Sequence, residues 1–222
     1  MIPKHHPMPG ILKAASAGTL SPAARLIVEA HRLYCTQCDR ELQAMDAFGG
    51  TLLDVIEPIA MTEGAFDRLM SAIDLKSPQK VTAPKNPVID LPETLVRAEP
   101  ELRAEGPWRF AGIGVKSLNL TIGSDQDAKA DHQALQLIQI GPKRRVPAHN
   151  HRGREWTLVL SGAFHDDDRS YGPGDILIMD KGRRHRPIGD AGGPCTALIL
   201  TEAPLAFSGV LGLAQMFWNC RQ

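Results

Sequence analysis

The sequence has no surplus of charge of either sign and no long apolar run. Its 222 residues include 25 Lys plus Arg and 25 Asp plus Glu, so the formal net charge is zero at pH 7. A chain without a basic excess has no general attraction for nucleic acid or anionic membranes. No apolar run approaches the roughly 18 residues of a membrane span, and the opening MIPKHHPMPG lacks the apolar core of a secretory signal. We therefore expect a cytoplasmic protein that contacts neither nucleic acid nor membrane.

Internal repeats and low-complexity segments are absent from the sequence as well. Hydrophobic residues make up 43% and charged residues 23%, as in an ordinary globular protein, and the length suits two small domains. Four prolines within residues 76–92 prevent a continuous helix there and favour an extended connector. We predict a helical domain over residues 1–75, a Pro-rich linker over 76–93 and a β-rich domain over 94–222. Such a linker indicates few contacts between the two domains.

Four helices are predicted in the first domain. Ser21 followed by Pro22 is a helix-start signal, with serine as the N-cap and proline in the first turn. A second helix is expected to stop at the glycine pair that begins with Gly49, and a third, short helix follows over residues 52–56. Thr62 can cap a fourth helix with a wide apolar stripe.

The second domain has the pattern of β structure. Short apolar runs alternate there with clusters of Gly, Pro and Asp at the spacing of strands and turns. We therefore predict an antiparallel β-sandwich or barrel. Its strands are expected within residues 109–122, 134–140, 155–162, 175–180 and 195–200.

His31, Cys35 and Cys38 form a His-x3-Cys-x2-Cys pattern. On one continuous helix these positions share a face, so an imidazole and two thiolates would converge on one point. This set supplies three ligands of a tetrahedral zinc site, and either His5 or His6 can supply the fourth; we favour His6. Two other interpretations stay open, in which these residues belong to an ordinary core or the cysteines form a redox pair.

The β-rich domain carries a second pattern, His149-x-His151-x3-Glu155. In a strand the two histidines point to the same face, and Glu155 follows a turn at Gly153. A Pro-Gly-Asp turn then begins a strand that a second turn reverses, so that His185 returns to the first pair. Three imidazoles and one carboxylate suit Zn, Fe, Mn or Ni, with one or two positions left for water or a substrate.

These spacings resemble the two motifs of the cupin superfamily, and the resemblance covers the chain from about residue 95 onward. The second motif departs from the pattern because it lacks the proline usual between its Asp and Gly. The resemblance implies a double-stranded β-helix, or jelly-roll, barrel. It places the metal ligands at His149, His151, Glu155 and His185. The superfamily leaves the function open.

The helical pattern and the cupin motifs together resemble the ChrR-type zinc-binding anti-sigma factors over nearly the whole chain. The resemblance implies an α+β protein in which a small, zinc-braced, all-α domain binds an extracytoplasmic-function (ECF) sigma factor, while a cupin domain governs release. By position it assigns one zinc to His6, His31, Cys35 and Cys38. It assigns a second metal, expected to be zinc, to the four cupin ligands. It also implies a response to oxidative stress such as singlet oxygen or hydroperoxides.

The role of the helical apolar residues and the choice between regulator and enzyme stay open. The helices have more apolar surface than a domain of about 75 residues buries alone, so part of it is either core or a partner surface. In a regulator, the helical domain alone should bind the sigma factor and the cupin domain should be needed for release. The alternative is a metal-dependent cupin enzyme, of the dioxygenase or isomerase type, with a helical dimerisation module. The candidates for partner contact are Leu52, Leu53, Ile56, Phe66, Leu69 and Met70.

Overall fold

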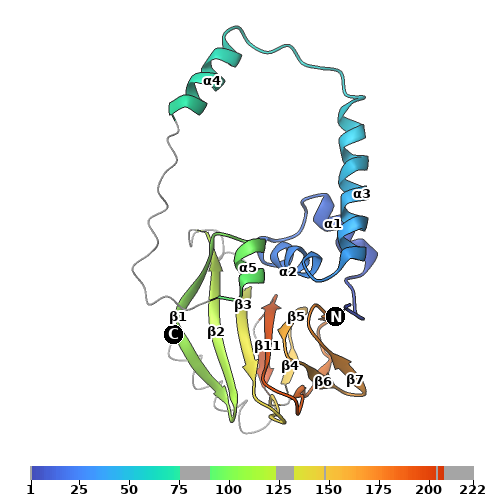
Figure 1. Cartoon of the computed structure of the whole chain (residues 1–222), viewed down its shortest axis with the longest axis vertical. Coiled ribbons are helices and arrows are strands. Elements are labelled where there is room, and N and C mark those ends of the chain that lie inside the picture. The colour runs from blue at the N-terminus through green and yellow to red at the C-terminus, as the bar shows by residue number, and fades with distance from the viewer. Residues whose placement is uncertain (1, 76–90, 124–132, 148, 204, 208–222) are drawn as a thin grey trace.

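The computed structural model describes residues 2–75, 91–123, 133–147, 149–203 and 205–207 (Figure 1). A helical half precedes an antiparallel β half, as the sequence predicts. None of the helices in these residues is long and apolar enough to cross a membrane. They are α1 (Pro9–Ser16), α2 (Pro22–Arg32), α3 (Thr36–Leu53), α4 (Ala65–Leu75) and α5 (Glu93–Ala98).

Helices α2 and α4 begin close to their predicted start signals. The Ser21 hydroxyl accepts a hydrogen bond from the backbone N–H of Ala24, and Pro22 lies in the first turn of α2. The carbonyl of Thr62 accepts the N–H of Ala65 at the start of α4. Helices α1 and α5 were not predicted.

Helix α3 differs from the prediction at both ends. The pattern over residues 31–38 predicts one continuous helix, but α2 ends at Arg32 and α3 begins at Thr36, with Cys35 as its N-cap. At the other end, α3 continues through Gly49 to Leu53, so the separate short helix expected there does not form. Glycine destabilises a helix by only about 1 kcal/mol relative to alanine, and the glycine pair does not end this one.

All strand pairs in the described part of the β half are antiparallel. The largest sheet has the order β1-β2-β3-β11-β5-β8, and the two smaller sheets have the orders β10-β6-β7 and β12-β4-β9. The predicted strand over residues 109–122 is a hairpin, because the chain turns between Gly112 and Val115. The strands are β1 (Leu102–Gly112), β2 (Val115–Ile122), β3 (Ala134–Ile140), β4 (His149–His151), β5 (Glu155–Ser161), β6 (Phe164–Asp166), β7 (Arg169–Tyr171), β8 (Ile176–Met179), β9 (Arg184–His185), β10 (Ile188–Gly189), β11 (Cys195–Thr201) and β12 (Leu205–Phe207).

One continuous core joins the helical half to the sheet. Leu12 of α1 and Ile27 of α2 belong to the same buried cluster as Trp156 of β5 and Leu198 of β11. Figure 1 shows α1, α2 and α5 gathered at one end of the large sheet. The expectation of few contacts between the two halves is therefore wrong.

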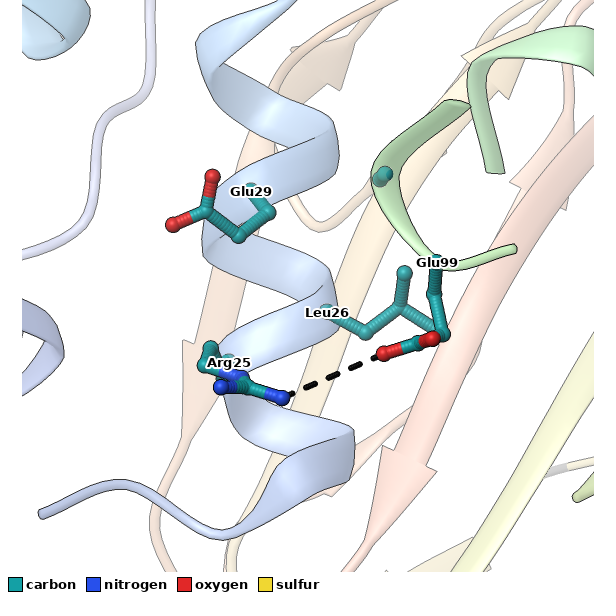
Figure 2. Close-up of a pocket in the computed structure, with 5 residues that line it drawn as sticks. Arg25, Leu26, Glu29 and Glu99 are labelled. Atoms are coloured by element: carbon teal, nitrogen blue, oxygen red, sulfur yellow. Dashed lines mark ion pairs between the residues drawn. The ribbon is translucent and has the colours of Figure 1, made fainter. Parts of the chain in front are cut away.

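Helix α5 adds a further contact with the helical half. It begins at Glu93, the last residue of the predicted linker, and it packs against α2. Figure 2 shows a pocket between these helices, where the Arg25 guanidinium lies 3.9 Å from the Glu99 carboxylate. The linker itself stays a prediction, since residues 76–90 lie outside the described part of the chain.

The far end of α3, the turn after it and α4 lie apart from the sheets (Figure 1). We call residues 48–73 the apolar arm. All six candidate partner residues belong to it, and their side chains are between 43% and 69% exposed, so they are not core residues. The large apolar residues exposed along the arm are Phe48, Leu52, Leu53, Val55, Ile56, Ile59, Met61, Phe66, Leu69, Met70 and Ile73.

A fragment of residues 1–85 is expected to be much less stable than the helical half of the full chain. Without the sheet, buried side chains of α2 such as Leu26 and Ile27 lose their cover. Burial of each such side chain contributes about 1.5–3 kcal/mol. Thermal unfolding followed by circular dichroism should show a low or missing transition for the fragment, and an undiminished transition would contradict the shared core.

Candidate metal centres

Four potential metal ligands converge in the helical half. His6 comes from the N-terminal arm, residues 2–8, and His31 from the last turn of α2. Cys35 is the N-cap of α3 and Cys38 lies in its first turn. One ligand atom from each residue lies within 4.8 Å of the others. The predicted set is therefore brought together, although by a break between two helices and not by one helix face.

The distances in this group fit a tetrahedral zinc ion. The Nδ1 atom of His6 lies 3.4 Å from the Cys35 sulfur and 3.5 Å from the Cys38 sulfur. Zinc bonds of about 2.0 Å to nitrogen and 2.3 Å to sulfur, at tetrahedral angles, place those atoms about 3.5 Å apart. Among the described residues, the buried Nε2 atom of His31 has no hydrogen-bond partner, and a metal would supply one.

Burial shifts the pKa values of two members of this group, His31 and Cys38. It lowers the pKa of His31, so the imidazole is neutral, and its Nδ1–H donates to the Gly174 carbonyl at 2.7 Å. Burial, together with the neighbouring Cys35, raises the pKa of the Cys38 thiol to about 12. The Cys38 thiol therefore stays protonated without a cation, and zinc binding would release its proton.

A second group lies in the β half. Strands β4 and β9 pair so that His149 lies opposite His185, and Glu155 begins β5. Ligand atoms of these three buried residues lie within 4.8 Å of one another. His151 lies on β4 two residues after His149. The side chain of His151 lies outside the described part, so its role as a ligand stays a prediction.

The geometry of this second group also fits a metal. The Nε2 atoms of His149 and His185 are 2.9 Å apart, and Nε2 of His185 is 3.9 Å from Oε1 of Glu155. Two nitrogens bound to one ion at about 2.0 Å and at right angles lie about 2.8 Å apart. The Nδ1–H of His149 donates to the Pro147 carbonyl at 2.8 Å, which leaves Nε2 as the ligand atom.

Proteins with known roles resemble the chain in both halves. The anti-sigma-E factor ChrR of Cereibacter sphaeroides is 35% identical over 221 residues, which cover 97% of this chain and 98% of that protein. This chain belongs to the ChrR family of anti-sigma factors. Residues 104–203 also match the family described as the ChrR cupin-like domain. A crystal structure of Rhodobacter sphaeroides SigE in complex with the anti-sigma ChrR matches with a TM-score of 0.69 and 33% identity, over 90% of this chain and 99% of that chain.

Membership of the ChrR family decides between the two functions left open by the sequence. The curated relative is an anti-sigma factor, which is a regulator and not an enzyme. The metal-dependent cupin enzyme is therefore not the function of this ChrR-family protein. The predicted fold, a helical half followed by a cupin half, is likewise confirmed.

Asp166 contacts the cupin group through His185, a role that the sequence did not reveal. Its buried carboxylate accepts the Nδ1–H of His185 at 3.1 Å, which directs Nε2 of that imidazole toward His149. Burial opposes the ionisation of Asp166, but the hydrogen bond and charge of His185 and the N–H of Arg186 hold its pKa below the ordinary value. The residue opens a run of three aspartates, which is typical of an exposed turn and gave no sign of burial.

The affinity of the cupin group for metal is expected to fall as the pH drops through about 7. Burial raises the pKa of Glu155 to about 7, so below that pH a proton must leave before the carboxylate can bind a metal. Titration with Zn²⁺ against a competing chelator at stepped pH should give a steeper pH dependence for the wild type than for Glu155→Gln. The helical group is the same in both proteins, so it contributes equally to both titrations. An equal pH dependence of Zn²⁺ affinity in the two proteins would exclude Glu155 as a ligand.

Proposed function

We propose that this ChrR-family protein binds an ECF sigma factor of the SigE kind and withholds it from RNA polymerase. The observation that carries the proposal is the 35% identity to the anti-sigma-E factor over 97% of the chain, which spans both halves. The match to a complex of SigE with ChrR supports a sigma factor as the partner. The place of action is the cytoplasm, where sigma factors meet RNA polymerase.

The apolar arm is the proposed contact surface. Monomeric proteins rarely expose a large continuous apolar surface, so the arm indicates a partner. On α4, Phe66, Leu69, Met70 and Ile73 follow the spacing of one helix face, and each described side chain is exposed. Such a face fits an apolar groove on another protein. The zero net charge agrees with recognition by shape and apolar contact.

We propose that zinc stabilises the base of the apolar arm. The ion would be bound by His6, His31, Cys35 and Cys38. These residues connect the N-terminal segment, the end of α2 and the start of α3, and α3 carries the first part of the arm. A structural zinc contributes its binding free energy to folding of the segments it joins. The direction in which α3 leaves the body of the protein would then depend on that ion.

The cupin half is proposed to sense an oxidative signal, such as singlet oxygen or a hydroperoxide. Its group of His149, Glu155 and His185, with His151 as the further predicted ligand, would leave one or two positions on a divalent metal, expected to be zinc, for a small molecule or oxidant. A signal releases the sigma factor only if it favours the free form over the bound form. The continuous core supports a physical path between the cupin half and the helices.

Reconstitution with an ECF sigma factor of the SigE kind tests the proposal. The purified chain should form a stable complex in size-exclusion chromatography and should block transcription from a promoter that depends on that sigma factor. Treatment with a hydroperoxide should free the sigma factor from the complex. The absence of a complex with every ECF sigma factor of the source organism would overturn the proposal.

A further inference from the structure

The turn over residues 172–175, between β7 and β8, holds the N-terminal arm against the cupin half. Oδ1 of Asp175 accepts the backbone N–H groups of Lys4, at 2.6 Å, and of His5, at 2.9 Å. Its Oδ2 accepts the N–H of Gly172 within the turn at 2.8 Å. In return, the carbonyl of His5 accepts the N–H of Ile176 at 3.1 Å. The residue next to His6 is therefore fixed on both sides of its backbone.

The same turn also reaches the second histidine of the helical group. The Gly174 carbonyl accepts the Nδ1–H of His31 at 2.7 Å, which sets the tautomer and the direction of that imidazole. Gly174 has a φ of +87°, and a Cβ there would lie 2.6 Å from Cβ of Tyr34 and 2.7 Å from Cγ of Pro3. Glycine is thus required at position 174, because the turn approaches both the N-terminal arm and the end of α2 closely.

Asp175 is suited to this role because it stays ionised. Burial works against its charge, but the N–H groups of Gly172, His5 and Lys4 hold its pKa below the ordinary value. A carboxylate with two acceptor oxygens can serve all three N–H donors at once. An amide in its place would turn one donor group toward another.

We propose that Asp175 is a positioning residue for the helical zinc site, and that the cupin turn over residues 172–175 orients two of its four ligands, His6 and His31. The inference rests on the zinc site proposed above. It makes zinc retention in the helical half depend on the cupin half. Strand β8 extends this link, since it begins directly after Asp175 and its Met179 pairs with the cupin ligand Glu155.

The test is Co²⁺ binding to the full chain, with Zn²⁺ affinity measured by chelator competition. Cysteine-to-cobalt charge-transfer absorption reports only a site with thiolate ligands. Asp175→Asn should lower the Zn²⁺ affinity of this site about 10- to 100-fold, the usual effect of removing a group that orients a ligand. Its cobalt spectrum should shift toward that of His6→Ala. The matched control is Asp190→Asn, because Asp190 also accepts a turn N–H, that of Gly192, but lies in neither metal group.

A second measurement covers the case in which Asp175→Asn does not fold. If Asp175 and the N-terminal arm stabilise the zinc site, the zinc site must also stabilise the position of the N-terminal arm. Loss of the zinc site should therefore loosen the N-terminal arm. In the full-length Cys38→Ala variant, the amides of Lys4, His5 and Ile176 should exchange with deuterium faster than in the wild type, while the amides of β11 keep their rates. Unchanged exchange in that variant, or a wild-type spectrum and affinity in a folded Asp175→Asn, would overturn the inference. A wild type without cysteine-to-cobalt absorption would instead overturn the zinc site itself.

Discussion

Replacement of Cys38 by alanine is expected to remove one zinc ion per chain and to abolish sigma-factor binding. The Cys38 sulfur lies 3.5 Å from Nδ1 of His6 and belongs to the four-residue helical group. Binding of a structural zinc contributes on the order of 10 kcal/mol to the folding of small domains, which exceeds what the remaining contacts of this region can replace. Elemental analysis and size-exclusion chromatography with the sigma factor measure the two losses. Cys35→Ala should behave in the same way.

The matched control for this experiment is Cys195→Ala. Cys195 is another buried cysteine, on β11, and burial raises the pKa of its thiol to about 12. It belongs to neither metal group, so the variant should keep both metals and sigma binding. Full zinc content in both Cys35→Ala and Cys38→Ala would exclude the helical site.

The second large effect is expected from the apolar arm. The double variant Phe66→Ser, Leu69→Ser should bind the sigma factor about a thousandfold more weakly, since central apolar contacts contribute about 2 kcal/mol each. Its thermal unfolding should change little, because both side chains are exposed in the free protein. Calorimetric titration with the sigma factor gives the affinity, and circular dichroism gives the stability.

The cupin half offers a matched control for the double variant of the apolar arm. Phe110 and Ile113 are about as apolar as the substituted pair and even more exposed, but they lie near the β1–β2 turn. Phe110→Ser, Ile113→Ser should leave sigma binding unchanged. If this pair weakens binding and the arm pair does not, the contact surface has been placed on the wrong half.

The sequence predicted most of the helical site but not the way in which it forms. His31, Cys35 and Cys38 do converge, yet the expected single helix is broken after Arg32. The Cys35 sulfur caps the next helix by accepting the N–H of Cys38 at 3.5 Å. No proline or glycine marks this break, so local sequence signals could not reveal it.

Contacts between distant parts of the chain were the least predictable. The Pro-rich segment suggested independent halves, whereas α2 packs on the sheet and Asp175 binds the N-terminal arm. In sequence, Asp175 had the appearance of an ordinary turn residue of a cupin motif. Its role depends on which surface the arm meets after folding, and that is decided by packing over the whole molecule and not by local preference.

The long separation between Lys4 and Asp175, 171 residues, bears on the order of events during protein synthesis. Ribosomes add about 5–20 residues per second, so the N-terminal arm is made roughly ten to thirty seconds before the turn over residues 172–175 that binds it. If Asp175 holds His6 in place, the helical zinc site of the nascent chain binds zinc more weakly during that time. A nascent chain would then gain full inhibitory power only when synthesis has passed the β7–β8 turn, and truncated products of interrupted translation would be poor competitors for the sigma factor.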